Sequence, residues 1–375
     1  MLNIMSLNTA KVTLLLLAIA TAVLLWSSTA AAASPGAVFT LTNETAGNSV
    51  AVFERSADGT LVAAGEFDTG GLGSGGGLGS QGAVILSQNN RFLFAVNAGS
   101  DDISAFRIEA GVLALTDKVS SGGDRPISLT TSGNLLYALN AGGSGNISGF
   151  TISNEGQLSP LVGSTRSLSS AASGPAQVEF SPNGRLLVVT EKATNVISTY
   201  TVEKNGLASG PNIQASAGAT PFGFAFDRQG DLIVSEAFGG NAGVSAVSSY
   251  DVSGGGDLDV ITASAGSNQT AACWIVVTND GRFTYTTNTG SGSISGYSIG
   301  SDGSLTLLDA DGRTGVTGDG SSPIDMSLSV NSRYLYTLNT GTHTISAFEV
   351  ESDGSLTPIP GVGGLPGPSV GLATY

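Results

Sequence analysis

Short apolar runs alternate with polar turns along most of the chain, and no stretch after residue 33 shows the spacing of an amphipathic helix. Segments such as RFLFAV (91–96) and RYLYTL (333–338) read as short strands whose side chains alternate between two faces. Turns rich in asparagine, aspartate and glycine separate them, as in SPNGR (181–185) and SDGSL (301–305). Asp-Gly and Asn-Gly suit tight hairpins because glycine tolerates positive φ. The pattern therefore predicts an all-β protein.

The strand pattern repeats seven times. Each copy has an apolar first strand, an alternating second strand, a third strand that ends in an aromatic residue, and a hairpin to a fourth strand. Aligned residues at the end of the second strands are spaced by 43 to 54 positions: Asn43, Asn97, Asn140, Glu191, Glu236, Asn288 and Asn339. A period of this size, built from short strands, is typical of a β-propeller. We expect residues 34–375 to form one seven-bladed β-propeller with four antiparallel strands per blade.

The two ends of this region predict how the ring closes. AVFTLT (37–42) resembles a second strand with no first strand before it, whereas GPSVGLATY (367–375) matches the first-strand pattern of PISLT (126–130). We expect residues 369–373 to pair with residues 38–41, so that the C-terminal strand becomes the innermost strand of the first blade. That pairing would remove the two open sheet edges of an unclosed ring.

Residues 1–33 have the layout of a secretory signal peptide. Lys11 precedes an apolar run over residues 12–26, and Ala31 and Ala33 form an A-x-A cleavage site. The run is short for a membrane span, although an uncleaved N-terminal anchor is the alternative. We expect a secreted or periplasmic protein that has no membrane span after cleavage.

The net charge and the residue composition limit which binding partners and which kinds of site are expected. The formal net charge is −15 with only 14 Lys and Arg residues, which makes nucleic acid and anionic membranes poor partners. Cys273 is the single cysteine, so it forms no internal disulfide, and its apolar surroundings indicate an inert buried thiol. His343 is the single histidine, which argues against a catalytic triad or a zinc site and favours an exposed loop position. We expect a monomer without a cofactor or bound metal.

Two segments partly resemble ligand-binding loops, one for phosphate and one for calcium. TGGLGSGGGLGSQG (69–82) lacks the Lys-Ser/Thr pair of a phosphate-binding loop and no helix follows it, so we interpret it as a flexible linker between two blades. DADGRTGVTGDG (309–320) has alternating acidic residues but too few ligands for a calcium loop. We expect no bound cation there.

The blade sequence GPAQVEFSPNGRLLVVTEKATNVISTY (174–200) resembles the seven-bladed lactonase propellers, which include 6-phosphogluconolactonase-like and carboxymuconate-cyclase-like proteins. The resemblance extends over residues 34–375. It implies an active site at the mouth of the central channel, with a His, an Arg and a Glu. The His of the family follows a proline in a P-x-H pattern at the start of a first strand. The third positions here are Ala83, Ser128, Gln177, Gly223, Trp274, Asp325 and Val370.

None of those seven residues is histidine. Gln177 stands where the resemblance implies the histidine, and a glutamine cannot transfer a proton at a useful pKa. Glu191 matches the region of the family's glutamate. Together with Glu236, it replaces asparagine in adjacent blades, so we expect two carboxylates at one rim, as an acid–base pair, a polar clamp or a cation site. Solvated rim residues are the alternative.

Other polar residues complete the predicted site. Arg125 and Asp325 are expected at the same mouth, where they would orient an anionic or sugar-like ligand. Gln177 and the strand-end asparagines Asn97, Asn140, Asn288 and Asn339 are the remaining candidate ligand-binding residues.

The missing histidine favours a binding module whose channel mouth takes a small molecule, a glycan or a protein. The alternative is a lactone hydrolase or cycloisomerase that uses Glu191 and Glu236. A structural surface or adhesion protein is a third class, consistent with the acidic exterior rich in Ser, Thr and Gly.

Overall fold

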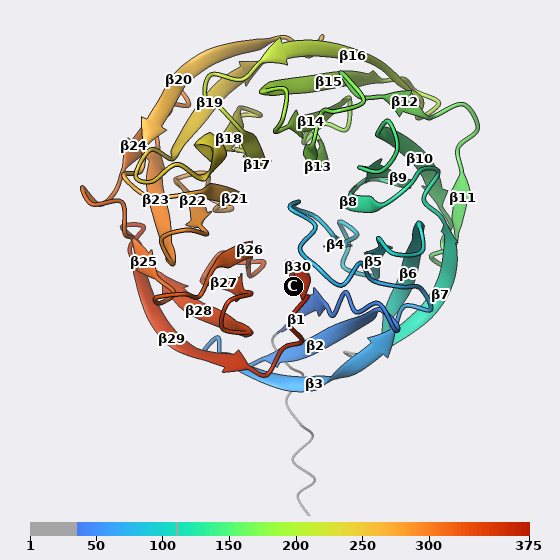
Figure 1. Cartoon of the computed structure of the whole chain (residues 1–375), viewed down its shortest axis with the longest axis horizontal. Helices are drawn as coiled ribbons and strands as arrows, with labels where there is room; N and C mark the ends of the chain where they lie inside the picture. The colour runs from blue at the N-terminus through green and yellow to red at the C-terminus, as the bar shows by residue number, and fades with distance from the viewer. Residues whose placement is uncertain (1–35, 110–111) are drawn as a thin grey trace, which may run out of the picture. The chain divides into compact units, whose positions relative to one another are not determined.

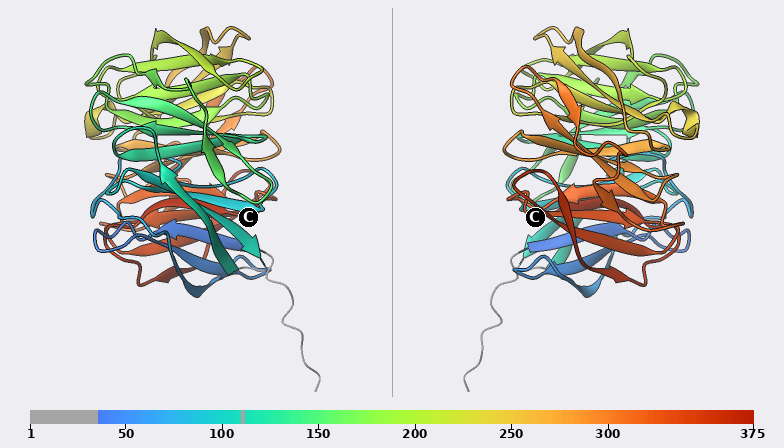
Figure 2. Two further views of the ribbon diagram at one scale, coloured as in Figure 1. Left: turned by 90° about the vertical axis from the view of Figure 1, so that its right-hand side faces the viewer. Right: turned by 90° about the vertical axis from the view of Figure 1, so that its left-hand side faces the viewer.

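The computed structural model describes residues 36–109 and 112–375, which form seven antiparallel β-sheets arranged as blades around one axis (Figure 1). The prediction of an all-β, seven-bladed propeller with four antiparallel strand positions per blade is confirmed. Edge-on views show outermost strands such as β7 and β29 running obliquely across the rim (Figure 2). The predicted signal peptide, residues 1–33, lies outside the described residues.

In every blade the strands follow one another from the axis to the rim. Blade 1 contains β30 (Val370–Thr374), β1 (Gly36–Leu41), β2 (Ser49–Arg55) and β3 (Leu61–Asp68). Blade 2 contains β4 (Val84–Leu86), β5 (Phe92–Asn97), β6 (Asp102–Glu109) and β7 (Val112–Ser120). Blade 3 contains β8 (Pro126–Ser132), β9 (Leu135–Asn140), β10 (Asn146–Ile152) and a fourth strand split into β11 (Leu158–Pro160) and β12 (Arg166–Ser167).

The remaining blades repeat this order. Blade 4 contains β13 (Pro175–Phe180), β14 (Leu186–Glu191), β15 (Val196–Val202) and β16 (Ala208–Ala215). Blade 5 contains β17 (Pro221–Phe226), β18 (Leu232–Glu236), β19 (Ala246–Val252) and β20 (Leu258–Gly266). Blade 6 contains β21 (Ala272–Val277), β22 (Phe283–Asn288), β23 (Ser293–Ile299), β24 (Leu305–Leu307) and β25 (Gly315–Val316). Blade 7 contains β26 (Pro323–Leu328), β27 (Tyr334–Asn339), β28 (Thr344–Val350) and β29 (Leu356–Gly363).

Helix is almost absent from the described residues. Their one helical element is a 3₁₀ turn at Phe238–Gly240, in the loop after β18. No helix within residues 36–109 and 112–375 is both long enough and apolar enough to cross a membrane.

The ring closes as the sequence predicts. β30 pairs antiparallel with β1, with Phe39 opposite Ala373 and Leu41 opposite Val370. Ala37 and Tyr375 extend the ladder, because each backbone N–H donates to the other residue's carbonyl oxygen at 3.1 Å. The innermost strand of the first blade therefore comes from the opposite end of the chain.

Tyrosines on the second strands tie neighbouring blades together. The hydroxyl groups of Tyr137 and Tyr336 each donate to a carbonyl oxygen 2.7 Å away, at Gly206 and Gly59 respectively. Both glycines lie at a φ of +84° in the hairpin between the third and fourth strands of the next blade. A buried tyrosine hydroxyl needs such a partner, and the turn needs a residue that tolerates positive φ. The same glycine therefore shapes a hairpin and joins two blades.

Candidate functional site

The glycine-rich segment 69–82 is not a free linker, because its end is bound to the first strands of blades 3, 4 and 6, the contact with blade 4 being the Gln81 N–H to the Ala176 carbonyl. The Ser80 hydroxyl donates to the Ile127 carbonyl at 2.7 Å, and the Ser80 backbone carbonyl accepts the indole N–H of Trp274 at 2.8 Å. Gln81 accepts the Ile275 N–H at 3.0 Å and donates its amide to the Ile275 carbonyl at 2.8 Å. We call residues 78–82 the plug, since they fill the axis beside the starts of the first strands.

Neighbouring residues are adapted to the plug. A Cβ atom at Gly223 would lie 2.4 Å from Gln81 Oε1 and 2.6 Å from the Cys273 carbonyl oxygen, so only glycine leaves the required space. The ammonium group of Lys192 donates to carbonyl oxygens of Gly79 and Pro175. Burial lowers the pKa of Lys192 to about 8. The plug is thus a built part of the ring, fixed by contacts with several blades.

Gln177 forms a second clamp of the same kind. Its Oε1 accepts the Phe224 N–H at 2.7 Å, and its Nε2 donates to the Phe224 carbonyl at 2.9 Å. This clamp joins the first strand of blade 4 to that of blade 5. The same Nε2 donates to Glu179 Oε2 at 2.7 Å. The residue at the expected histidine position therefore ties two blades together and orients a carboxyl group.

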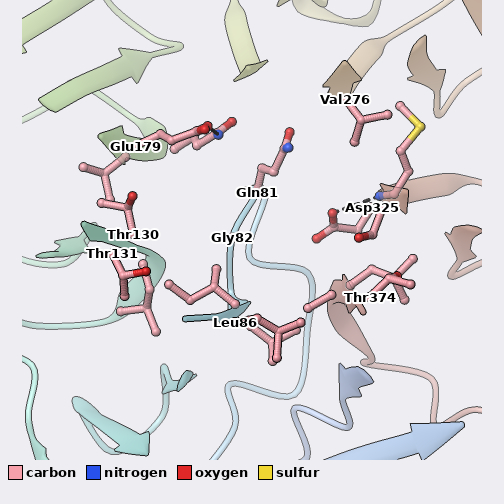
Figure 3. Close-up of a pocket in the computed structure, with 18 of the residues that line it drawn as sticks. Gln81, Gly82, Leu86, Thr130, Thr131, Glu179, Val276, Asp325 and Thr374 are labelled. Atoms are coloured by element: carbon pink, nitrogen blue, oxygen red, sulfur yellow. Dashed lines mark hydrogen bonds between the residues drawn. The ribbon is translucent and has the colours of Figure 1, made fainter. Parts of the chain in front are cut away.

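A cavity of ≈ 360 Å³ adjoins the plug at the axis of the ring (Figure 3). Gln81 and Gly82 line one side, and the other walls come from the first strands of six blades. On β13 and β26 the lining residues are Gln177–Glu179 and Asp325–Ser327, which are the middle of each strand. The cavity therefore extends from the plug toward the face that carries the turns between first and second strands.

The two ionisable residues that line the cavity are both acids. Glu179 is partly exposed, and burial raises the pKa of its carboxyl group to about 8 against the opposing hydrogen bond from Gln177. Asp325 is only 1% exposed, and burial raises its pKa well above the ordinary value. Its Oδ1 accepts the Met326 N–H at 2.9 Å, while Oδ2 has no hydrogen-bond partner among the described residues. Burial therefore favours the protonated form of Asp325, and Glu179, with a pKa of about 8, is mostly protonated at pH 7.

Glu179 is a residue that the sequence reasoning missed. In a strand, every second residue faces the same side, so Glu179 shares the inner face with Gln177, two positions earlier. That alternation, applied to PAQVEF, is the signal that would have identified it.

Glu191 and Glu236 do not lie at an open rim. Both are fully buried (0% exposed), and neither lines the cavity. Glu191 accepts the Ser169 N–H at 3.1 Å and the Ser198 hydroxyl at 2.6 Å. Glu236 accepts the Gly218 N–H at 2.7 Å and the Ser264 hydroxyl at 2.6 Å. Burial raises the pKa of Glu236, and these hydrogen bonds, with one from Ser248, oppose the increase.

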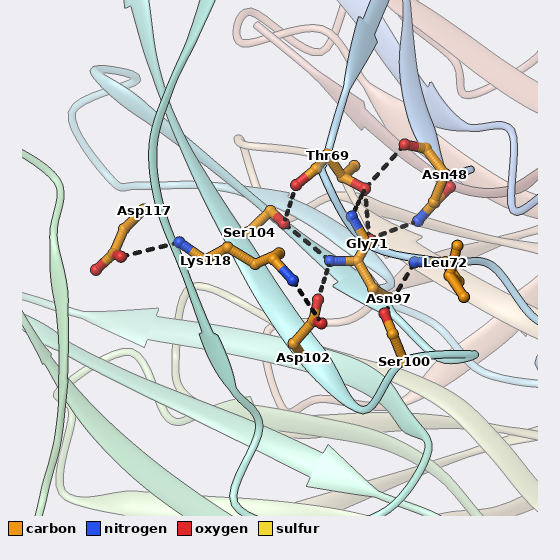
Figure 4. Close-up of polar contacts among 10 residues, drawn as sticks. All are labelled: Asn48, Thr69, Gly71, Leu72, Asn97, Ser100, Asp102, Ser104, Asp117 and Lys118. Carbon is orange, nitrogen blue, oxygen red and sulfur yellow. Dashed lines mark hydrogen bonds and ion pairs between the residues drawn. The ribbon is translucent and has the colours of Figure 1, made fainter.

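The strand-end asparagines, like Glu191 and Glu236, form hydrogen bonds within their own blades. Asn97 donates to Asp102 Oδ1 at 2.5 Å and to Ser104 Oγ at 2.8 Å, and accepts the hydroxyl of Thr69 at 2.6 Å (Figure 4). The amides of three others likewise donate to hydroxyl groups on the third strand: Asn140, Asn288 and Asn339. None of the four lines the cavity. In blade 1 the equivalent ladder position is Thr42, because Leu41 pairs with Val50, so Asn43 lies one residue beyond the repeat.

Arg125 and Asp325 are not brought together in the cavity. Arg125 is exposed, does not line the cavity, and donates its backbone N–H to Asp101 Oδ1 at 2.6 Å. It has a φ of +54°, and Thr220 and Ser322, which precede the first strands of blades 5 and 7, also have positive φ. This conformation is thus a repeated feature of the entry into a first strand rather than a mark of function.

The remaining sequence-based expectations concern single residues. Cys273 is buried, as predicted, and burial raises the pKa of its thiol to about 12. His343 lies in an exposed turn, as predicted. Within residues 36–109 and 112–375, no group of three or more His, Cys, Asp or Glu side chains could hold a metal ion.

Comparisons with known proteins agree with this architecture. The family model described as "Lactonase, 7-bladed beta-propeller" matches residues 36–172, 162–253 and 245–369. Among curated proteins, none matches the chain. A candidate 6-phosphogluconolactonase from Bacteroides fragilis has a similar structure, with a TM-score of 0.71 and 20% identity over 91% of this chain and 98% of that one. A periplasmic gluconolactonase from Pseudomonas aeruginosa has a TM-score of 0.67 and 18% identity, over 90% of this chain and 99% of that one.

Proposed function

Because the chain belongs to the seven-bladed β-propeller lactonase family, we propose that it hydrolyses a lactone in the cavity beside Glu179. The observation that carries this proposal is a partly exposed glutamate in the wall of a cavity of ≈ 360 Å³, where burial raises the pKa of its carboxyl group to about 8. A volume of this size fits a small ring compound, and a general base works best when its pKa lies near the working pH. Glu179 is the accessible ionisable group there.

The chemistry requires one proton to be moved twice. The Glu179 carboxylate accepts a proton from water as the water oxygen bonds to the lactone carbonyl carbon. When the tetrahedral intermediate collapses, the bond between the carbonyl carbon and the ring oxygen breaks. Glu179 then returns the proton to the ring oxygen, and the product is an open-chain hydroxy acid. A positioned base of this kind contributes a factor of roughly 10²–10⁴ to the rate.

Two neighbours support this role for Glu179. Gln177 fixes one carboxyl oxygen through its amide, and the Phe224 clamp fixes Gln177 in turn. Thr130 lines the same wall of the cavity, and its Oγ1 accepts the Phe180 N–H at 3.0 Å (Figure 3). Its own hydroxyl proton remains able to donate to a carbonyl oxygen, which would stabilise the developing negative charge.

A binding module is the second candidate function. It is favoured by the absence of histidine at all seven third positions and by the plug, which occupies the axis where the family pattern would place an active site. A lactone hydrolase that uses Glu191 and Glu236 is the other version of the enzyme hypothesis. Their carboxylates are already engaged with serine hydroxyls and backbone N–H groups, which supports Glu179 instead.

Export is part of the proposal. The signal-peptide pattern over residues 1–33 supports a location in the periplasm or outside the cell. N-terminal sequencing of the protein from the periplasm or the medium should begin at Ser34. Recovery of an intact N-terminus in the membrane fraction would instead support the uncleaved anchor.

The test of the function is acid release from five- and six-membered lactones, with spontaneous hydrolysis subtracted. The native protein should hydrolyse at least one of them, and Glu179→Gln should lower kcat/KM by about 10²–10⁴. Glu155→Gln, at an exposed turn of blade 3, removes the same charge outside the cavity and should leave the rate unchanged. Native protein without activity, or a fully active Glu179→Gln variant, would contradict the proposal.

A further inference from the structure

The cavity lining indicates which lactones fit. We infer, resting on the proposed function, that the substrate is an uncharged, polyhydroxylated lactone rather than a phosphorylated or carboxylated one. The argument comes from the charges, hydroxyl groups and apolar surfaces that line the cavity.

No cation lines the cavity. Among the described residues that form its walls, the ionisable ones are Glu179 and Asp325, and no Lys, Arg or His is present. Proteins hold phosphate groups with Arg or Lys side chains or with clusters of backbone N–H groups at helix N-termini. The one helical element in the described residues is the three-residue turn in the loop after β18. An anionic group in this cavity would therefore lose its hydration without gaining a positive partner.

The reactive state makes an anion less favourable still. Glu179 must be ionised to act as a base, so the cavity carries a negative charge when it is active. At a separation of a few ångströms in a partly buried site, two like charges repel by several times thermal energy. An uncharged ligand is not subject to this repulsion.

Arginines are present nearby but outside the cavity. Arg91, Arg185, Arg228, Arg282 and Arg333 are exposed on turns between first and second strands, and they line three separate surface grooves. Arg282 and Arg333 already face Asp280 and Glu349. These cations therefore provide no charge to the cavity walls.

The remaining lining suits a sugar-like ring. Thr130, Thr131, Ser327 and Thr374 present hydroxyl groups that can donate to and accept from ligand hydroxyls. Val276 and Met326 add apolar surface, against which the C–H face of a ring can pack. Asp325 adds a carboxyl group and no positive charge. This combination of hydroxyls, one base and apolar surface matches a polyol lactone.

The test measures binding without turnover. Calorimetry would compare glucono-1,5-lactam, which resists hydrolysis, with its 6-phosphate derivative, using the native protein at pH 8.5. The neutral lactam should bind about tenfold more tightly or better. Glu179→Gln should reduce that discrimination by improving relative binding of the phosphate, while Glu155→Gln should leave it unchanged.

The outcomes separate this inference from the proposed function. Equal or tighter binding of the phosphorylated lactam would overturn the inference while leaving hydrolysis in the cavity intact. Absence of binding by either lactam would overturn both the inference and the assignment of the cavity as the site. Selective binding of the neutral lactam by a protein that hydrolyses no lactone would contradict the proposed function alone.

Discussion

The two ends of the propeller axis differ in what fills them. At the end where the first strands begin, the plug binds backbone groups of blades 3, 4 and 6 through Ser80 and Gln81. Farther along the same strands, a cavity of ≈ 360 Å³ is left, with Glu179 in its wall. One end is thus closed by hydrogen bonds that hold the ring together, and the other retains space and an ionisable group.

This difference separates the position that the family pattern indicates from the position of the candidate base. The family resemblance points to the starts of the first strands, where Gln177 replaces the expected histidine. In this chain the Gln177 amide ties blade 4 to blade 5, and the ionisable residue, Glu179, lies two residues farther along the strand. The same first strand therefore serves stability at one position and supplies the candidate base at another.

The largest effect on stability is expected from removing β30, the strand that closes the ring and also lines the cavity. Truncation before Gly367 removes β30, which pairs with β1 and contributes Leu372–Thr374 to the cavity wall. We expect the melting temperature to fall by roughly 10 °C or more, because the ring loses both its closure and a buried strand.

A peptide of residues 367–375 added in trans should restore part of the lost stability. A truncated chain that melts like the full chain would contradict the closure, and recovery with a scrambled peptide would show that the pairing is not specific.

The next largest effect on stability is expected at Glu191 and Glu236, which are buried outside the cavity, rather than at Glu179. Glu191→Gln and Glu236→Gln would each place an amide NH₂ against groups that already donate, such as the Ser169 and Gly218 N–H groups. We expect each change to lower the free energy of unfolding by about 1.5–3 kcal/mol, while kcat/KM changes little. Urea unfolding and lactone assays would be measured on the same preparations.

Glu179→Gln provides the reciprocal control, since it should lower the rate with little loss of stability. If either Glu191→Gln or Glu236→Gln abolished turnover in a folded protein, the result would contradict Glu179 as the base and support the pair predicted from the sequence.

A smaller effect is expected at the closed end. Gly223→Ala would place a Cβ atom 2.4 Å from Gln81 Oε1 and force the plug or the strand to shift. We expect a loss of about 1–3 kcal/mol in the free energy of unfolding, as for other overpacked sites. Gly266→Ala is the matched control, because no atom lies within 4 Å of its added methyl group. Equal stability of the two variants would show that the plug is not packed as described.

Much of the fold follows from the repeat in the sequence, because strand period and hairpin chemistry are local properties. The closure by GPSVGLATY also follows, since its pattern matches the other first strands. The plug could not be predicted in this way, because Ser80 and Gln81 meet Trp274 and Ile275 across 194 positions of the chain. A glycine-rich segment has no side-chain pattern that reveals such partners.

The candidate site was predicted only in part. Gln177 and Asp325 do line the cavity, as their equivalence to the family's third position suggested. Glu191 and Glu236 align with the asparagines, but their serine partners lie on a preceding loop, as with Ser169, and on the fourth strand of the same blade, as with Ser264. Those partners bury the carboxylates and use their hydrogen-bonding capacity. Alignment fixes a residue's position along a strand, whereas its chemical role depends on such neighbours.

The pH dependence of lactone hydrolysis tests the central claim most directly. Burial raises the pKa of Glu179 to about 8, and only the ionised carboxylate can act as the base. With spontaneous hydrolysis subtracted, kcat/KM should rise about tenfold per pH unit below pH 8 and level off above it, and Glu191→Gln should show the same profile. A rate that is independent of pH between 6 and 9, or that falls over this range, would contradict the assignment of Glu179 as the base.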